Sequence, residues 1–413
     1  MANVSSSNGL EKRPKLRFPG FDEPWQSTLL SSVFAKNTKK NTDGQITNVI
    51  CNSAKQGLIP QREYFDKDIA NSDNTNGYYI IEENDFVYNP RKSADAPYGP
   101  ISRYKYAEAG IVSPLYLCFR AKTEINPAFF EWYFRSSAWH RYVYMSGDSG
   151  ARHDRVSIKD DTFLAMPINL PAAHEQEHIA SFLERIDQRI EMQRALVENL
   201  KKYKRGLLRE VFDKSHLTSE CKYECWKEVK LGEICTYRRG SFPQPYGLPE
   251  WYDEEHGMPF IQVADVNDNM TINLDTNRHI SDMAKNRSVF IPEGTLIVTL
   301  QGTIGRVAIT TYDAYIDRTL LVIQNISDCV LKEFLMYAIY MKFDVEKQTA
   351  DGSIIKTITK ETLTDFSIYL PSIHEQQRIV NLLRSFDRRL ENSVTVLAEL
   401  HRFRSSLLQQ LFI

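Results

Sequence analysis

The chain has 413 residues, of which 42% are hydrophobic and 25% are charged, with 18 glycines and 17 prolines. This composition is typical of a folded protein of two or three domains, and it excludes a wholly disordered or collagen-like chain. Lysine and arginine number 51 against 53 aspartates and glutamates, a formal charge of -2, so a nucleic-acid-binding surface has to be a local patch.

The N-terminal segment is basic but does not resemble a targeting sequence. Lys12, Arg13, Lys15 and Arg17 are not followed by the apolar run of a signal peptide. No stretch of the chain approaches 18 consecutive apolar residues, the length that indicates a membrane span. We therefore expect a cytoplasmic protein with no membrane association.

The six cysteines are too sparse for a disulfide framework in a chain of this length. Cys221 and Cys225 have a spacing that zinc sites use, with His216 and Cys235 nearby. The four side chains do not form two tight ligand pairs, so we expect reduced thiols and no metal site.

In chain order, the sequence predicts a domain over residues 1–170, a helix over 171–213, a second domain over 214–370 and a second helix over 371–413. Short alternating apolar runs broken by Gly and Pro, such as residues 115–119, 296–299 and 320–323, predict strands with a few helices between them. We expect both domains to be mixed α/β, which makes the whole chain α+β.

An internal repeat organises this pattern. Residues 170–212 and 370–412 match at an offset of 200 without a gap, and they share a Leu-Pro start and the His-Glu-Gln of 174–176 and 374–376. The repeat continues upstream at slightly larger offsets. The matching positions there are Trp25, Leu30 and Val33 with Trp226, Leu231 and Ile234, residues 81–88 with 291–298, and Phe130 and Tyr133 with Phe334 and Tyr337.

Both copies of the 43-residue segment predict long helices, since a proline lies at each start and an acidic residue lies in each first turn. Apolar residues recur at heptad spacing, at Ile179, Leu183, Ile186, Ile190, Val197, Leu200, Leu207 and Val211, and at Ile379, Leu383, Phe386, Leu390, Leu397, Leu400, Leu407 and Leu411. The same seam positions are interrupted by Gln193 and Ser393, and by Lys204 and Arg404. Such polar interruptions fix the register of a coiled coil.

The order of the segments predicts how the helices pair. The first helix ends where the second domain begins, and the second helix begins where that domain ends, so the two helices should be antiparallel with a domain at either end. Residues 175–212 would form a rod of roughly 57 Å, long enough to set a distance.

Motifs of the common enzyme classes are missing from the sequence. It has no GxxxxGK[ST] phosphate loop, no GxGxxG fingerprint, no HExxH and no GxSxG. Asn126-Pro127-Ala128-Phe129 resembles the Asn-Pro-Pro-aromatic motif of adenine methyltransferases only in part, and no glycine-rich cofactor loop precedes it. We predict no catalytic residues.

The two His-Glu-Gln triplets have residue types that are common in acid–base catalysis. Their place in the first turn of a long helix favours a structural or docking role, since Glu complements the helix dipole there. The docking candidates are His174, Glu175, Gln176, His374, Glu375 and Gln376.

Loops of both domains combine cations and amides with glycines and aromatics, a mixture that suits phosphates and base edges. Each cluster alone could be an ordinary solvated loop, but several occupy corresponding places in the two copies. The DNA-binding candidates are Arg91, Lys92, Arg103, Lys105, Arg152, Arg155, Arg238, Arg239, Gln301, Arg306, Arg318 and Lys356.

With its two LPxxHEQ helices, its Trp-x4-Leu motifs and a divergent domain before each helix, the chain resembles the specificity subunits of type I restriction-modification systems over nearly its full length. The resemblance implies two target-recognition domains, each reading half of a bipartite double-stranded DNA site. It also implies that the antiparallel helices set the spacing and dock methyltransferase subunits.

The resemblance further implies that the chain binds no cofactor itself. Adenine methylation and ATP-dependent cleavage would belong to the methyltransferase and restriction/translocase subunits, which use S-adenosylmethionine, ATP and Mg²⁺. The alternative from another class of protein is a coiled-coil scaffold that bridges two protein partners without contacting DNA.

Overall fold

The computed structural model describes residues 12–64, 75–147, 154–212, 226–349 and 363–413. The chain folds into two units, one of residues 1–195 with 395–413 and the other of residues 196–394. Each unit therefore combines one mixed α/β domain with one end of each long helix, α6 (Ala173–Phe212) and α12 (Ile373–Leu411).

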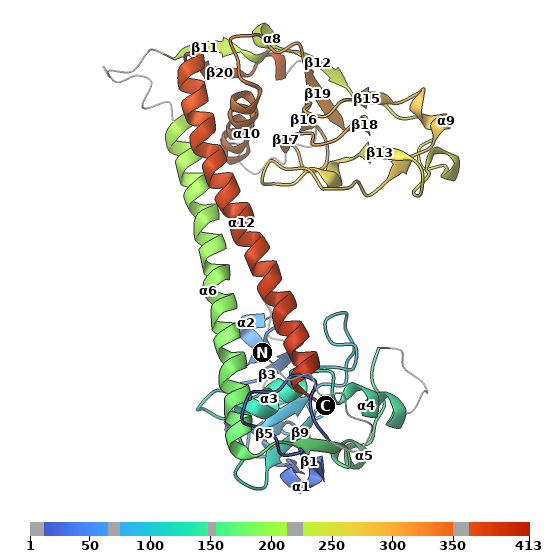
Figure 1. Cartoon of the computed structure of the whole chain (residues 1–413), viewed down its shortest axis with the longest axis vertical. Coiled ribbons are helices and arrows are strands. Elements are labelled where there is room, and N and C mark those ends of the chain that lie inside the picture. Colours follow the sequence, from blue (N-terminus) through green and yellow to red (C-terminus); the bar gives the residue numbers. More distant parts are fainter. Residues whose placement is uncertain (1–11, 65–74, 148–153, 213–225, 350–362) are drawn as a thin grey trace. The chain divides into compact units, whose positions relative to one another are not determined.

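The first unit is built on a four-stranded antiparallel sheet of order β2-β9-β6-β7, of which β9 is labelled in Figure 1. Two-stranded pairs β3-β4 and β5-β8 lie outside this sheet. The elements are β1 (Gln26–Leu29), α1 (Leu30–Val33), β2 (Phe34–Lys36), β3 (Ile50–Ser53), β4 (Gly57–Pro60), α2 (Gln61–Tyr64), β5 (Tyr79–Ile81), β6 (Phe86–Tyr88), β7 (Ile101–Arg103), β8 (Gly110–Val112), β9 (Leu117–Ala121), α3 (Pro127–Arg135), α4 (His140–Ser146), α5 (Asp160–Leu164) and β10 (Pro167–Leu170).

The second unit repeats this sheet as β12-β19-β16-β17 and adds a four-stranded sheet of order β14-β13-β18-β15. Its elements are β11 (Lys227–Lys230), α8 (Leu231–Ile234), β12 (Thr236–Arg239), η2 (Pro249–Trp251), β13 (Met258–Ile261), η3 (Val263–Asp265), β14 (His279–Ile280), α9 (Asp282–Lys285), β15 (Val289–Ile291), β16 (Leu296–Thr299), β17 (Val307–Ile309), β18 (Ala314–Ile316), β19 (Leu320–Gln324), α10 (Lys332–Thr349) and β20 (Ser367–Leu370).

Matching residues of the repeat occupy matching places. The strand before each domain pairs antiparallel with the strand before each long helix, β1 with β10 and β11 with β20. The turns that lead into β6 and β16 both need a left-handed residue, which is Asn84 (φ 70°) in the first unit and Gly294 (φ 77°) in the second. The predicted repeat and the α+β fold class are therefore confirmed.

Aromatic and aliphatic side chains fill the main core of each unit. In the first unit, Phe34 packs edge-on against Phe86, Phe119 and Phe130, all of them buried. The core of the second unit replaces this aromatic cluster largely with aliphatic residues such as Leu296, Val298 and Leu321. Asn126 has a local role, since its side chain accepts a hydrogen bond from the backbone N–H of Phe129 and caps α3.

The seam of the long helices is packed as the heptad pattern predicts. In the first unit, Ile179 and Leu183 of α6 share a core with Leu407 and Leu411 of α12. In the second unit, Leu208 of α6 shares a core with residues 379 and 383 of α12. The two helices are therefore antiparallel in both units. Next to the predicted seam residue Leu207, which is partly buried against this core, Leu208 is 1% exposed and is buried in it as well.

Two of the polar interruptions of the seam, Lys204 and Arg404, form ion pairs between the helices. Arg404 of α12 pairs with Asp187 of α6 in the first unit, and Lys204 of α6 pairs with Asp387 of α12 in the second. The two pairs are equivalent in the repeat. Arg404 and Lys204 are 200 residues apart, as are Asp187 and Asp387, so the cation comes from α12 in one pair and from α6 in the other. Because an ionic partner would be lost by a slip of the seam, these pairs favour this register.

Among the described residues, none of the helices combines the length and the apolar character needed to cross a membrane.

Candidate nucleic-acid interface

In the second unit, strands β12, β13 and β16 end beside the start of β19. β12 and β16 flank β19 antiparallel, and β13 runs parallel to β18, from which the chain turns into β19. Backbone N–H groups close this junction by donating from Leu300 to Thr319, from Asp317 to Ile261 and from Gly240 to Leu320. The residues that follow these strands lie together, and we call Arg239, Tyr246, Gln262, Gln301 and Arg318 the second-unit corner.

The junction depends on one glycine. A Cβ at Gly240 would lie 2.2 Å from the backbone oxygen of Asp317, a distance that no side chain tolerates. Glycine therefore allows the end of β12 to approach the turn between β18 and β19, and this approach places Arg239 against that turn. The Arg239 Nε–H donates to the backbone oxygen of Arg318 at 2.6 Å.

An exposed tyrosine lies at the centre of the second-unit corner. The Tyr246 side chain is 42% exposed, its ring packs against Phe242, and the guanidinium of Arg318 lies 5.7 Å from the ring centroid. The Nε2 amide of Gln262 donates to the Tyr246 hydroxyl at 2.6 Å. An arginine, an aromatic ring and an amide thus share one surface.

Burial and the negative charge of Asp317, in that order, raise the pKa of Tyr246 to about 12. The hydroxyl therefore stays protonated at neutral pH. It meets Gln262 as a neutral group, so this contact adds no charge to the surface.

The structure brings together three of the predicted candidates of the second domain. Arg239, Gln301 and Arg318 belong to the corner, and Arg238 is exposed beside Arg239 on β12. Arg306 is used differently, because its guanidinium donates to the backbone oxygen of Val266 at 2.9 Å and pairs with Asp268. It fastens a loop of the domain. Lys356 lies outside the described residues.

The corresponding place in the first unit is also basic. Arg91 forms an isolated antiparallel bridge with Arg155, and the Lys92 N–H donates to the backbone oxygen of Asp154 at 2.9 Å. Arg91 and Lys92 are exposed and Arg155 is partly exposed. Lys36, at the end of β2, pairs with Asp160 and lines a hollow of about 150 Å³ together with Pro90 and Val156, the residues next to Arg91 and Arg155 in the chain.

We call Lys36, Arg91, Lys92 and Arg155 the first-unit corner. Lys36 forms an ion pair with Asp160, whereas Arg91 and Lys92 are exposed to solvent. The hydrogen bond to Asp160 is the main reason that the pKa of Lys36 is raised, so this ammonium is held in its charged form. Arg152 lies outside the described residues.

Arg103 and Lys105 lie away from this corner. β6 and β7 are antiparallel, with Phe86 opposite Arg103, so residues after β7 lie near the start of β6 while Arg91 follows its end. Arg103 donates to the side chain of Asn84, and both Arg103 and Lys105 pair with the largely buried carboxylate of Glu131. These two cations therefore neutralise a buried charge of their own domain.

The sequence predicts no role for four further residues, Tyr246, Gln262, Lys36 and Arg120. Arg120 pairs with the buried Asp85 and with Glu82, and the hydrogen bond to Asp85 is the main reason that its pKa is raised. No motif marks these residues. A signal was available for Lys36 alone, since its strand corresponds to the strand that carries Arg238 and Arg239.

The predicted docking triplets are only partly exposed, because Glu175 and Gln376 are buried. Glu175 is 1% exposed and forms two hydrogen bonds of 2.8 Å with the guanidinium of Arg17. Gln376 is fully buried. Its amide donates to the backbone oxygens of Cys329 and Pro371, and its oxygen accepts from the Leu331 N–H. Both residues bind other parts of their own unit.

The other members of the triplets differ in exposure. His174 and His374 are exposed, Gln176 and Glu375 are partly exposed, and Glu375 pairs with Arg378 on its own helix. A docking role for these four residues stays a prediction.

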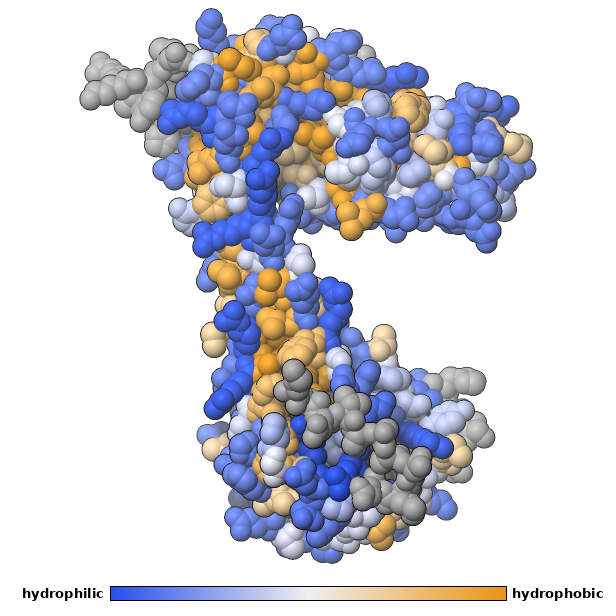
Figure 2. Space-filling model, in the orientation of Figure 1, coloured by the Kyte–Doolittle hydropathy of each residue, from blue (hydrophilic) through white to orange (hydrophobic). Residues whose placement is uncertain are grey.

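The long helices also carry exposed apolar side chains at positions outside the predicted heptad pattern. Leu196 and Tyr203 on α6 are repeated as Val396 and Phe403 on α12, and all four are between 39% and 62% exposed. In the view of Figure 2, apolar residues gather along the helices. Each helix thus repeats an exposed aliphatic residue that is followed seven positions later by an exposed aromatic residue.

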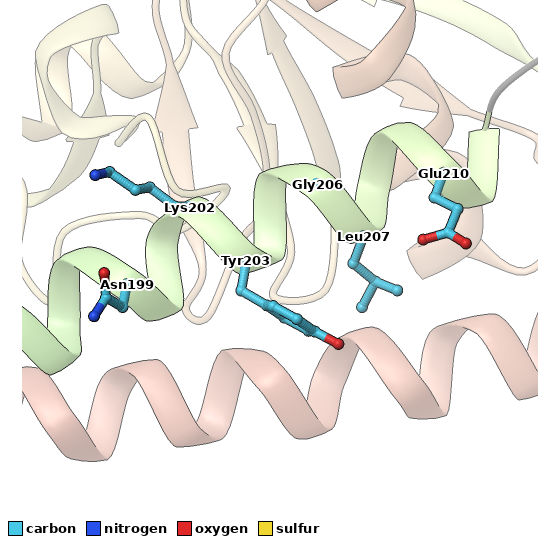
Figure 3. Close-up of a pocket in the computed structure, with 6 residues that line it drawn as sticks. All are labelled: Asn199, Lys202, Tyr203, Gly206, Leu207 and Glu210. Carbon is cyan, nitrogen blue, oxygen red and sulfur yellow. The ribbon is translucent and has the colours of Figure 1, made fainter.

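A shallow groove of about 500 Å³ lies along α6 in the second unit, around Tyr203, Gly206 and Leu207. Figure 3 shows the side chains of Tyr203 and Leu207 directed toward α12. Tyr203 stacks on Phe386 with ring centroids 5.3 Å apart, and a Cβ at Gly206 would meet open space. The groove exists because glycine leaves this face of the helix bare.

Among the described residues, no cluster of three or more His, Cys, Asp or Glu side chains could hold a metal ion. Cys221 and Cys225, whose spacing suggested zinc ligands, lie outside the described residues.

Among solved structures, the chain is similar to a protein solved in work on the complex assembly and conformational transition of the type I R-M system, with a TM-score of 0.64 and 20% identity over 95% of this chain and 98% of that one. It is also similar to the type I restriction-modification system S subunit from M. genitalium, with a TM-score of 0.54 and 16% identity over 97% and 99%. At these identities the likeness establishes the fold.

Among curated relatives, the putative type I restriction enzyme MjaX specificity subunit of Methanocaldococcus jannaschii is 27% identical over 249 residues, which are 58% of this chain and 56% of that protein. The chain thus spans little more than half of this relative. The model of the type I restriction modification DNA specificity domain matches twice, over residues 23–202 and 223–402. The chain therefore belongs to the family of type I restriction-modification specificity proteins and carries two copies of its DNA specificity domain.

Proposed function

We propose that the chain is the sequence-specific DNA-binding subunit of a type I restriction-modification complex, in which each domain reads one half of a bipartite site. The observation that carries this proposal is the repetition of the specificity domain with an exposed basic corner at corresponding strand ends in each copy. A chain with a formal charge of -2 has no general attraction to DNA, so such local corners are where contact is expected.

The two kinds of side chain at the corners would do different work. Exposed cations such as Arg91 and Lys92 suit phosphate oxygens, which fix the position of a protein on the duplex. Amide and arginine groups such as those of Gln301 and Arg318 suit base edges in the major groove, which carry the sequence.

We further propose that the helices dock methyltransferase subunits. The repeated exposed pairs, Leu196 with Tyr203 and Val396 with Phe403, support this role because exposed aromatic anchors are enriched in protein interfaces. The groove beside Gly206 would accept a side chain of such a partner.

On this proposal the chain is not an enzyme and binds no cofactor. Methyl transfer from S-adenosylmethionine and ATP- and Mg²⁺-dependent cleavage would be the work of the methyltransferase and restriction/translocase subunits. The complex would act on double-stranded DNA in the cytoplasm. Methyl transfer to DNA by the rigorously purified chain alone would contradict this division of labour.

A gel-shift titration of the complex with its methyltransferase subunits tests DNA recognition against the scaffold alternative. We expect sequence-selective binding whose affinity falls with salt, because phosphate contacts release counterions. A scaffold that only bridges proteins would show neither sequence selectivity nor dependence on the two corners. Binding without selectivity between DNA sequences would also contradict the proposed function.

A further inference from the structure

Gln262 is held at a fixed place on the second-unit corner. Its backbone N–H donates to Asp265 at 2.8 Å, and Asp265 is completely buried. The same carboxylate accepts from Asn273 and from the backbone and side chain of Asn277. A carboxylate with this many donors ties the start of η3 to the following loop, so the Cα of Gln262 has little freedom.

The side chain of Gln262 is also oriented. Its Nε2 group donates to the Tyr246 hydroxyl, and the Tyr246 ring in turn contacts Phe242 and the Arg318 guanidinium. Gln262 is partly exposed and Tyr246 is 42% exposed, so the pair lies at the surface and not in the core. An amide that is both exposed and fixed has already lost the rotamer freedom that binding would otherwise remove.

The chemistry of the pair favours a base over a phosphate. The amide is neutral, and so is the tyrosine hydroxyl, which means that neither group adds to the attraction for the DNA backbone. The positive charge of this corner lies on the cations beside them, Arg239 and Arg318. A glutamine amide offers a donor and an acceptor side by side, which is the pattern that matches the N7 and N6 positions of adenine in the major groove.

We propose that Gln262 reads one base pair in the half-site of the second domain, and that Tyr246 is the positioning residue that holds its amide. This inference rests on the proposed function. The class of ligand is the major-groove edge of a base pair in double-stranded DNA, with adenine as the base that the amide recognises.

The test uses the complex with its methyltransferase subunits and DNA libraries in which each position of the site is varied. Gln262→Ala is expected to reduce discrimination at one position of the second half-site by about 5- to 150-fold, the range for a lost bidentate base contact. The first half-site and the dependence of affinity on salt should not change. Selectivity in the first half-site reports that the complex is assembled and folded.

Gln324→Ala is the matched control. Gln324 is an exposed glutamine at the far end of β19 in the same domain. It should leave discrimination at every position unchanged.

Two further variants separate a base contact from a structural effect. Gln262→Glu keeps the shape but exchanges the amide for an acceptor, so the preference at the same position should move toward cytosine, whose N4 is a donor. Tyr246→Phe keeps the ring and removes the hydroxyl that holds the amide, so it should weaken discrimination at that position by about 2- to 10-fold.

The outcomes distinguish the two proposals. If the unaltered complex shows no sequence selectivity, the proposed function fails. If the unaltered complex is selective and both Gln262 variants keep the same preference at every position, the base-reading role is refuted while the proposed function stands.

Discussion

The two units share a framework and differ where their strands end. The sheets β2-β9-β6-β7 and β12-β19-β16-β17 have the same order and the same antiparallel pairing. At the corners, however, the first unit presents Lys36, Arg91, Lys92 and Arg155, while the second presents two arginines, a tyrosine and two glutamines. Framework positions must satisfy the same packing in both copies, whereas corner residues are free to differ and can serve two different half-sites.

A second contrast lies at the starts of the long helices. Glu175 is buried against Arg17, whereas the equivalent Glu375 is partly exposed and pairs within its own helix. In the triplet of the second unit it is Gln376 that is buried, and it forms three hydrogen bonds with its own unit. The same triplet therefore fastens each helix to its domain through a different member.

Arg17→Ala sharpens this contrast and should have the largest effect on stability. Removing the guanidinium leaves the Glu175 carboxylate buried without its charge partner, which costs about 3 to 5 kcal/mol. Urea unfolding measures the loss, and hydrogen exchange should rise over the start of α6. The matched variant Arg378→Ala, which removes the partner of Glu375, should cost less than about 1 kcal/mol. Equal losses in the two variants would contradict the contrast.

Asp387→Ala tests the repeated ion pair of the seam. The change leaves the Lys204 ammonium, whose side chain is 8% exposed, without its partner and removes the acceptor of the Tyr337 hydroxyl. We expect a loss of about 2 kcal/mol, because hydrogen bonds to charged groups contribute that much.

The equivalent variant in the first unit, Asp187→Ala, should cost less than Asp387→Ala. Arg404 is 27% exposed there and keeps contact with water. The control is Glu191→Ala, which breaks an exposed pair with Arg194 and should not change stability measurably. If Asp187→Ala lowered the free energy of unfolding more than Asp387→Ala, burial of the paired cation would not determine the loss of stability.

Arg91→Ala should have a smaller effect that appears only in DNA binding. Arg91 is exposed at the first-unit corner, so losing a phosphate contact should lower the salt slope by about one. Arg103→Ala is the comparison, because Arg103 is engaged by Asn84 and Glu131 and should leave the slope unchanged. If Arg103→Ala lowers the slope and Arg91→Ala does not, the DNA-facing part of the first unit has been misassigned.

The sequence was sufficient to predict the repeat, the antiparallel helices and the polar seam positions, because heptad spacing and repeated motifs are local or periodic signals. It was insufficient to tell which charged residues were already paired. Arg103 and Lys105 were predicted to bind DNA, but in the fold both pair with Glu131, which is distant in the sequence. Glu175 was predicted to dock a partner, but in the fold it pairs with Arg17. The contact between Tyr246 and Gln262 joins separate loops and has no sequence signature.

On the proposed function, each unit reads its own half of a bipartite site. The most direct test replaces residues 214–369 with the equivalent domain of a family member that has another specificity, and sequences the DNA that the assembled complex methylates. We predict that one half-site changes to that of the donor while the other keeps its sequence. A change in both half-sites, or in neither, would contradict the claim.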